Sequence, residues 1–241
     1  MTVSAIDLRM SSQDFVGGRM IEGEKIRFAT VDVGDGHFWV RIRSWTHGGE
    51  SMGIHAGHCL TEQELVDKIA KYGVNPQCVF VDLGWEQTET AEVCWRNGWR
   101  GVKGDGKRKQ GWETRITKGP RKGQTELKLY GGMYYATTKT RKRVEVWQIA
   151  TSPLQYILQR LIEGKGARWE VENDAPPLFA KHLNNERLII EKGIPKWERF
   201  GNQHFRDTEI YQLALALMAG AFLPSRQDEA EAAKAMEEKS E

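Results

Sequence analysis

Apolar and polar side chains alternate between residues 27 and 58, with the two-residue period of half-buried β-strands. The dipeptides Asp35-Gly36 and Gly48-Gly49 interrupt the alternation, and both favour tight turns. The pattern therefore predicts an antiparallel meander of three strands, at Arg27–Val33, His37–Trp45 and Glu50–His58.

From residue 61 to residue 103 the pattern alternates between helix and strand. Thr61 and Glu64 carry the capping-box signature of a helix start. Two short apolar runs, Cys78–Leu83 and Arg100–Lys103, lie on either side of a second helix at Glu86–Asn97. The resulting order, β-β-β-α-β-α-β, places the fourth strand parallel to the first. It predicts an α/β fold with a mixed sheet flanked by helices.

The second half of the chain is less regular. Glycine, lysine and arginine dominate residues 104–150, which we expect to form a basic loop and a β-hairpin that project from the body. Residues 164–185 show no regular pattern. The other predicted elements are the hairpin strands Glu126–Ala136 and Arg143–Ile149, a helix from the cap Ser152 to Glu163, a hairpin of Glu186–Lys192 and Pro195–Phe200, and an apolar helix at Phe205–Phe222.

The domain organisation follows from these patterns. We expect an N-terminal arm or linker at residues 1–26, one domain at residues 27–223, and a flexible acidic tail at residues 224–241. No apolar run approaches the 18 residues of a transmembrane helix, and Asp7 and Arg9 lie where a signal peptide needs an apolar core. The three cysteines form no C-x-x-C pair, which argues against a disulfide framework and a cysteine-rich zinc site.

Positive charge is concentrated in one part of the chain. Residues 100–143 contain 14 lysines and arginines but three acidic residues, whereas the rest contains 21 basic and 30 acidic residues. Such a block is either a solvated loop or a surface for a polyanion, and we expect it to bind the DNA backbone without reading sequence. Trp112 within it could stack on a base. The candidate DNA-binding residues are Lys103, Lys107, Arg108, Lys109, Arg121, Lys122, Arg141, Lys142 and Arg143.

Three aspartates stand out by their positions in the predicted elements. Asp32 lies among β-branched residues in the first strand, Asp82 ends the fourth strand, and Asp207 opens the final apolar helix. Each alone could have a structural role in a turn, a strand end or a helix cap. Together they converge, because the first and fourth strands are neighbours and a helix packed across them can bring its first turn to the same place.

Three carboxylates at one point repel each other and need a cation. Oxygen ligands suit Mg²⁺ or Mn²⁺, and a pair of such ions about 4 Å apart can catalyse phosphodiester hydrolysis. His204 and Glu209 lie close to Asp207 in the sequence and are possible auxiliary residues. Glu209, two positions along, is not expected on the same face of the helix.

Several short motifs share an order and spacing with a known family. They are Val31-Asp32-Val33-Gly34, the segment 45–53 with its Gly-Glu-Ser turn, Asp82, Val102-Lys103-Gly104, and Phe205-Arg206-Asp207 ahead of an apolar helix. Across residues 26–223 the chain resembles the nuclease domain of the large terminase subunit of tailed bacteriophages, in particular the lambda-type branch.

The resemblance implies a ribonuclease H-like fold and a metal-dependent endonuclease that cuts concatemeric viral DNA during genome packaging. Asp32 would then bridge two ions, Asp82 would hold the ion on the water side, and Asp207 the other. The implied partners are double-stranded DNA, a packaging ATPase domain, the small terminase subunit and the portal, in the cytoplasm of an infected or lysogenic bacterium. The chain departs from the family because it has no G-x-x-x-x-G-K-[ST] phosphate loop, so we expect the nuclease part alone.

Two other interpretations remain open from the sequence. The same fold could belong to a resolvase-type or transposase-type nuclease. Alternatively, the protein could be a DNA-binding scaffold without catalysis, in which the three aspartates are structural.

Overall fold

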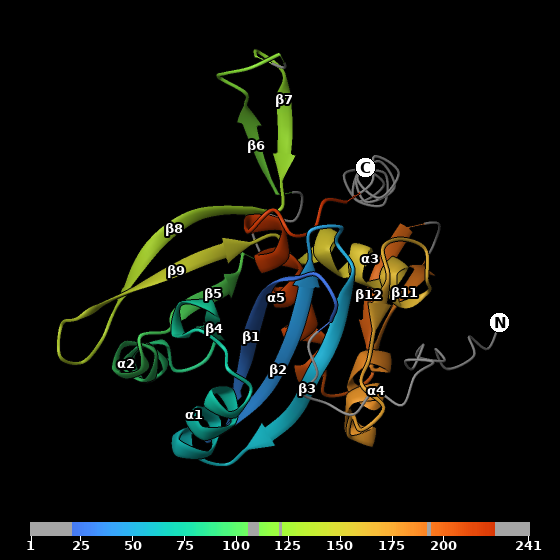
Figure 1. Cartoon of the computed structure of the whole chain (residues 1–241). Coiled ribbons are helices and arrows are strands. Elements are labelled where there is room, and N and C mark those ends of the chain that lie inside the picture. The colour runs from blue at the N-terminus through green and yellow to red at the C-terminus, as the bar shows by residue number, and fades with distance from the viewer. Residues whose placement is uncertain (1–20, 106–110, 121, 192–193, 225–241) are drawn as a thin grey trace.

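The computed structural model describes residues 21–105, 111–120, 122–191 and 194–224 (Figure 1). Its centre is a mixed sheet of eight strands in the order β10-β3-β2-β1-β4-β5-β9-β8. The strands are β1 (Glu24–Gly34), β2 (His37–Thr46), β3 (Ser51–Cys59), β4 (Val79–Asp82), β5 (Arg100–Gly104), β8 (Tyr130–Thr137), β9 (Arg143–Ile149) and β10 (Trp169–Glu170).

The predicted meander and crossover are confirmed. β1, β2 and β3 pair antiparallel, and the register places Asp32 of β1 opposite Trp39 of β2. β4 pairs parallel with β1, β5 with β4, and β9 with β5. The carboxyl ends of β1, β4 and β5 therefore lie at one edge of the sheet.

Helices cover both faces of the sheet, and alternation along β1 decides what each face meets. Ala29 and Val31 belong to a core that is covered by α1 (Glu62–Lys71) and α2 (Gln87–Asn97). In the chain, β4 follows α1 and β5 follows α2. Phe28 and Thr30 face the opposite layer, where Thr30 donates a hydrogen bond of 3.0 Å to the carbonyl of Thr208. The helices of that layer are α3 (Thr151–Ile162), α4 (Pro177–Asn184) and α5 (His204–Met218).

Thr61 caps α1 as predicted, and Glu64 reaches back to the residue before the cap. The hydroxyl of Thr61 accepts from the backbone N–H of Glu64 at 3.2 Å, and the Glu64 carboxylate accepts from the N–H of Leu60 at 2.7 Å. These bonds satisfy free N–H groups at the helix start, as the spacing predicted. A single turn of 3₁₀-helix, η1 (Pro76–Cys78), precedes β4.

Residues 104–150 do not form one projection, which corrects the sequence-based expectation. β9 joins the central sheet because Val144, Val146 and Ile149 are buried against it, and β8 pairs with β9 at the sheet edge. The hairpin of β6 (Trp112–Arg115) and β7 (Thr125–Lys128) does extend away from the body (Figure 1).

The prediction that residues 164–185 are irregular is wrong, because this segment contains β10 and α4. Phe179, His182 and Leu183 have helical spacing after a proline pair, and all three are buried. Ser152 does not cap α3, which begins at Thr151 after Ala150 with no side-chain cap.

The predicted hairpin near residue 193 is confirmed by β11 (Glu186–Glu191) and β12 (Ile194–Arg199). Residues 1–20 of the predicted arm and residues 225–241 of the predicted tail lie outside the described part of the chain. No helix within the described ranges is long and apolar enough to cross a membrane.

Candidate functional site

The three aspartates lie where the topology predicted them. Asp32 is near the end of β1, Asp82 is the last residue of β4, and Asp207 is in the first turn of α5. α5 packs across β1 and β2, and this brings its N-terminal turn to the edge where β1 and β4 end. The three carboxyl groups therefore come from three elements that are distant in sequence.

The charge of Asp32 affects the pKa values of the other two aspartates. Burial, and then the negative charge of Asp32, raise the pKa of Asp82 to about 7. The same two causes, in the same order, raise the pKa of Asp207 to about 7. Lys103 and Arg199 oppose these shifts, at Asp82 and Asp207 respectively, without cancelling them.

Each carboxyl group is held by a neutral donor or a ring. The backbone N–H of Gly84 donates to Asp82 at 3.0 Å, and the Tyr211 hydroxyl also hydrogen-bonds to Asp82. The amide of Gln203 donates to Asp207 at 3.3 Å. In the described part of the chain, no lysine or arginine forms an ion pair with any of the three.

Asp32 is in close contact with a histidine ring. Nδ1 of His204 lies 2.6 Å from Oδ2 of Asp32. The imidazole is stacked on the indole of Trp39, with ring centroids 5.0 Å apart and planes 3° apart. Trp39 also contacts His58 and His182, at centroid distances of 4.3 and 4.9 Å. This packing fixes the ring so that its Nδ1 faces the carboxylate.

His204 is thus at the site, but its partner is Asp32 rather than its sequence neighbour Asp207. Trp39, Gln203 and Tyr211 belong to the site and were not predicted. Tyr211 had a signal, because it follows Asp207 by four residues and therefore lies on the same helical face. Trp39 could not be assigned to the site from the sequence, because its position opposite Asp32 depends on the strand register.

Glu209, suggested from the sequence as an auxiliary residue, contacts two arginines and none of the three aspartates. Its carboxylate is fully buried and accepts from Nε of Arg41 at 2.5 Å and from both Nε and a terminal nitrogen of Arg43, at 3.0 and 2.9 Å. Arg41 also pairs with Glu172. Burial favours the neutral form of Glu209, but Arg43 and Arg41 outweigh it and lower its pKa. Its charge is therefore neutralised within the core.

The chemistry of the three aspartates can be compared with the needs of a metal ion. Their oxygen atoms suit a hard divalent cation, and among the described residues none of the three is in an ion pair with a lysine or an arginine. As the side chains are placed, however, the described residues contain no group of three or more His, Cys, Asp or Glu arranged to hold a metal ion. Metal binding would therefore require the carboxylates to turn toward a shared ion.

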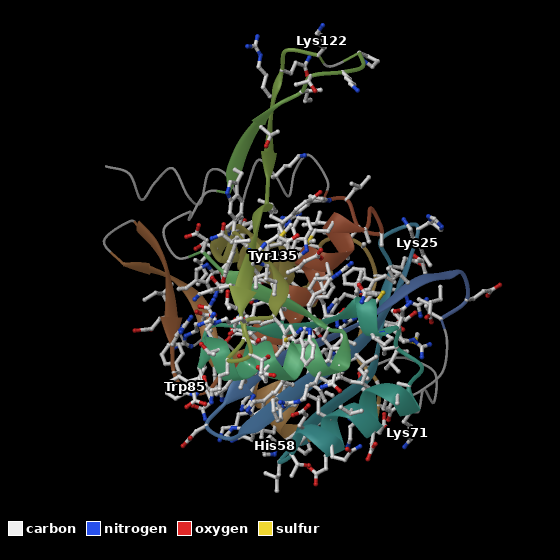
Figure 2. All side chains as sticks on the ribbon, turned by 90° about the vertical axis from the view of Figure 1, so that its left-hand side faces the viewer. Lys25, His58, Lys71, Trp85, Lys122 and Tyr135 are labelled. Atoms are coloured by element: carbon white, nitrogen blue, oxygen red, sulfur yellow. The ribbon has the colours of Figure 1, made fainter. Side chains whose placement is uncertain are left out.

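The predicted DNA-binding residues fall in three places. Lys103 is close enough to Asp82 to lower its pKa. Lys122 is exposed at the end of the β6–β7 hairpin, and Figure 2 shows it at the opposite end of the molecule from His58 and Trp85. The exposed residues Arg141, Lys142 and Arg143 lie where β8 turns into β9, whereas Lys107, Arg108, Lys109 and Arg121 lie outside the described residues.

Trp112 is half-buried at the base of the hairpin rather than fully exposed. It packs so closely on Gly131 that a Cβ atom there would lie 2.0 Å from the indole. This contact ties the hairpin to β8 and limits the ring as a platform for a base.

No protein-family model, curated protein or solved structure matches this chain. A function must therefore be argued from the aspartates, their surroundings and the topology that brings them together.

Proposed function

We propose that the protein is a metal-dependent endodeoxyribonuclease with a ribonuclease H-like fold. Its place would be the nuclease domain of a lambda-type terminase large subunit, which cuts concatemeric viral DNA during packaging. The observation that carries the proposal is the convergence of Asp32, Asp82 and Asp207 at one edge of the sheet, where two of them have a pKa of about 7. Strongly perturbed carboxyl groups that cluster in this way are typical of functional sites.

The topology supports the fold assignment. The strand order β3-β2-β1-β4-β5, with β2 alone antiparallel to its neighbours, is compatible with a ribonuclease H-like sheet. In α/β sheets of this kind, ligands bind beyond the carboxyl ends of parallel strands. Asp82 lies at such an end.

The cofactor that fits this donor set is a pair of Mg²⁺ or Mn²⁺ ions, held by the three aspartates. Such ions would supply Lewis-acid stabilisation of the attacking and leaving oxygens in phosphodiester hydrolysis. The chain's own residues prepare the ligands. His204 fixes the position of Asp32, Tyr211 and the N–H of Gly84 hold Asp82, and Gln203 holds Asp207.

Double-stranded DNA is the proposed substrate, and its backbone would approach over Lys103, which lies beside Asp82. The β6–β7 hairpin and the β8–β9 turn would add contacts away from the cut. In the same proposal the domain works with a packaging ATPase domain, the small terminase subunit and the portal, in the cytoplasm of the infected bacterium.

The decisive test is cutting of supercoiled plasmid by the purified chain. With Mn²⁺ or Mg²⁺ we expect slow conversion to nicked, linear and then degraded DNA, because the sequence has no phosphate-loop motif that would couple cutting to ATP hydrolysis. EDTA should stop the reaction, and ATP should leave its rate unchanged. Discrete fragments would contradict the expectation of non-specific cutting, and stimulation by ATP would reveal a nucleotide requirement that the sequence does not predict.

Single substitutions connect the activity to the site. Asp32→Asn, Asp82→Asn and Asp207→Asn should each abolish cutting and keep the circular-dichroism spectrum of the parent. Asp67→Asn, an exposed aspartate of α1, is the matched control and should cut normally. Full activity in one of the three variants would remove that residue from the site, and DNA binding without metal-dependent cutting in the parent would favour a scaffold.

A further inference from the structure

A cavity of about 200 Å³ lies where α2 ends and where β5 and β9 begin. Because β4, β5 and β9 run parallel, this is the opposite edge of the sheet from Asp82. Its lining includes the rings of Trp95 and Trp99 and the side chains of Arg100 and Arg143. Aromatic rings and guanidinium groups therefore share one small hollow.

Two of the three charged residues that line this hollow are basic. Arg100 is held by the carboxylate of Glu145 at 3.3 Å and donates to the carbonyl of Gln77 at 3.3 Å, so its position is fixed. Arg143 and Lys142 have no acidic partner among the residues that the structure describes. The ammonium group of Lys142 lies 5.6 Å from the ring centre of Trp95. Of the two arginines that line the hollow, Arg100 is therefore neutralised and Arg143 is not, while Lys142 lies beside Trp95 without belonging to the lining.

The walls are already in place without a ligand. The β8–β9 turn is fastened to α2, since Lys139 pairs with Glu89 at 2.8 Å and Thr140 donates to Glu92 at 3.5 Å. Trp95, on the same helix, remains 44% exposed beside this contact. A large ring that is left open within a formed, positively charged hollow offers a surface on which a planar group can stack.

We propose that this cavity binds one nucleotide unit, with its base on Trp95 and its phosphate at Arg143 and Lys142. Guanidinium groups match phosphate oxygens in pairs, and indole rings stack on any base. The volume favours a single unit, because pockets for drug-sized ligands measure roughly 300–1,000 Å³. The unit comes either from a single DNA strand or from a free nucleoside phosphate. This inference does not depend on cutting at the aspartates.

Calorimetric titration of the full chain in EDTA at low salt tests the site, since removing metal separates binding from cutting. The probes are dAMP, deoxyadenosine, inorganic phosphate and a single-stranded ten-residue oligonucleotide. We expect dAMP to bind, and Trp95→Ala and Arg143→Ala each to weaken it about tenfold. Trp95→Phe should retain most of the affinity, because a ring remains for stacking.

Two variants control for general effects. Trp85→Ala removes another indole, 52% exposed, and Lys71→Ala removes another cation. Neither residue lines the cavity, so both variants should change dAMP affinity less than twofold. Absence of dAMP binding, or equal affinity in the parent and Trp95→Ala, would overturn the proposal. Phosphate binding as tightly as dAMP would also overturn it, since the site would then hold only an anion.

The oligonucleotide identifies the source of the nucleotide. If it binds at least tenfold more tightly than dAMP and loses that advantage in Trp95→Ala, the occupant is a unit of a DNA strand. If the two affinities are equal, the occupant is a free nucleotide. Both results support the cavity as a nucleotide site, and both remain interpretable if the chain fails to cut plasmid.

Discussion

Replacing Asp207 by Asn should raise the thermal stability of the metal-free protein at pH 8 while it abolishes DNA cutting. Burial and the charge of Asp32 raise the pKa of Asp207 from its ordinary value of 3.8 to about 7. In the unfolded chain both effects are lost. The folded protein therefore holds this proton up to a higher pH than the unfolded chain does, and ionisation at pH 8 costs folding free energy.

The difference between the folded and unfolded pKa of Asp207 sets the direction and the size of the stability change. The destabilisation caused by the Asp207 carboxylate is absent at pH values below about 4, grows as the pH rises to about 7, and stays at its full size above it. A shift of about three pKa units corresponds to about 4 kcal/mol. Asp207 keeps some contact with solvent, which screens part of this energy. We therefore expect Asp207→Asn to raise the free energy of unfolding at pH 8 by about 1–3 kcal/mol. For a domain of this size the melting temperature should rise by roughly 3–10 °C.

Thermal melting in EDTA at pH 8 and pH 5 measures the effect. The gain from Asp207→Asn should shrink at pH 5 to roughly a third, because the folded carboxyl group is then largely protonated. Asp67→Asn, whose side chain is exposed, is the control and should change the melting temperature little at either pH. Adding Mn²⁺ at pH 8 should stabilise the parent and not Asp207→Asn, since a ligand that binds the folded state raises its stability.

Two results would refute the reasoning. If Asp207→Asn lowers the melting temperature at pH 8, its carboxylate stabilises the fold and is not repelled by Asp32. If the variant is more stable by the same amount at both pH values, the gain comes from packing and not from ionisation.

Three further outcomes are expected. Gly53→Ala should lower the free energy of unfolding by about 1–3 kcal/mol in denaturant titration, because its Cβ would lie 2.0 Å from a buried arginine nitrogen. His204→Ala should raise the Mn²⁺ concentration for half-maximal cutting about tenfold, and His204→Gln should restore part of it, since the ring positions a proposed metal ligand. Replacing Lys107, Arg108 and Lys109 together by Ala should flatten the salt dependence of DNA affinity by about three in log–log slope, and an unchanged slope would place the DNA path elsewhere.

The alternation of side chains sufficed to predict the first five strands and the two helices between them, because each is a local pattern with clear turn signals. The same patterns brought Asp32 and Asp82 to one edge, since a right-handed crossover leaves few alternatives. The position of the β8–β9 pair was predicted wrongly, because the pattern of Arg143–Ile149 is the same for a strand of a projecting hairpin and for a strand inside the central sheet. Only its parallel pairing with β5, a long-range contact, distinguishes the two.

Side-chain partners were harder to predict than strands. A histidine next to Asp207 in the sequence suggests a contact with Asp207, but the packing of α5 on β1 and β2 directs His204 to Asp32 instead. Glu209 shows the same limit. Its partners Arg41 and Arg43 lie far away in sequence, and alternation alone does not say that two arginines point into the core.

One helix, α5, joins two environments of opposite electrostatic character. One of its faces brings Asp207 toward Asp32, where like charges repel. Another carries Glu209 into a buried network in which two arginines and two glutamates balance, and breaking such a network by removing one partner typically costs about 3–5 kcal/mol. The Gln212 amide nitrogen lies within hydrogen-bonding distance of three oxygen atoms of β1 and β2, and its oxygen accepts from the indole N–H of Trp45. These contacts hold the helix on the sheet, so they offset the repulsion and keep the carboxylates close without metal.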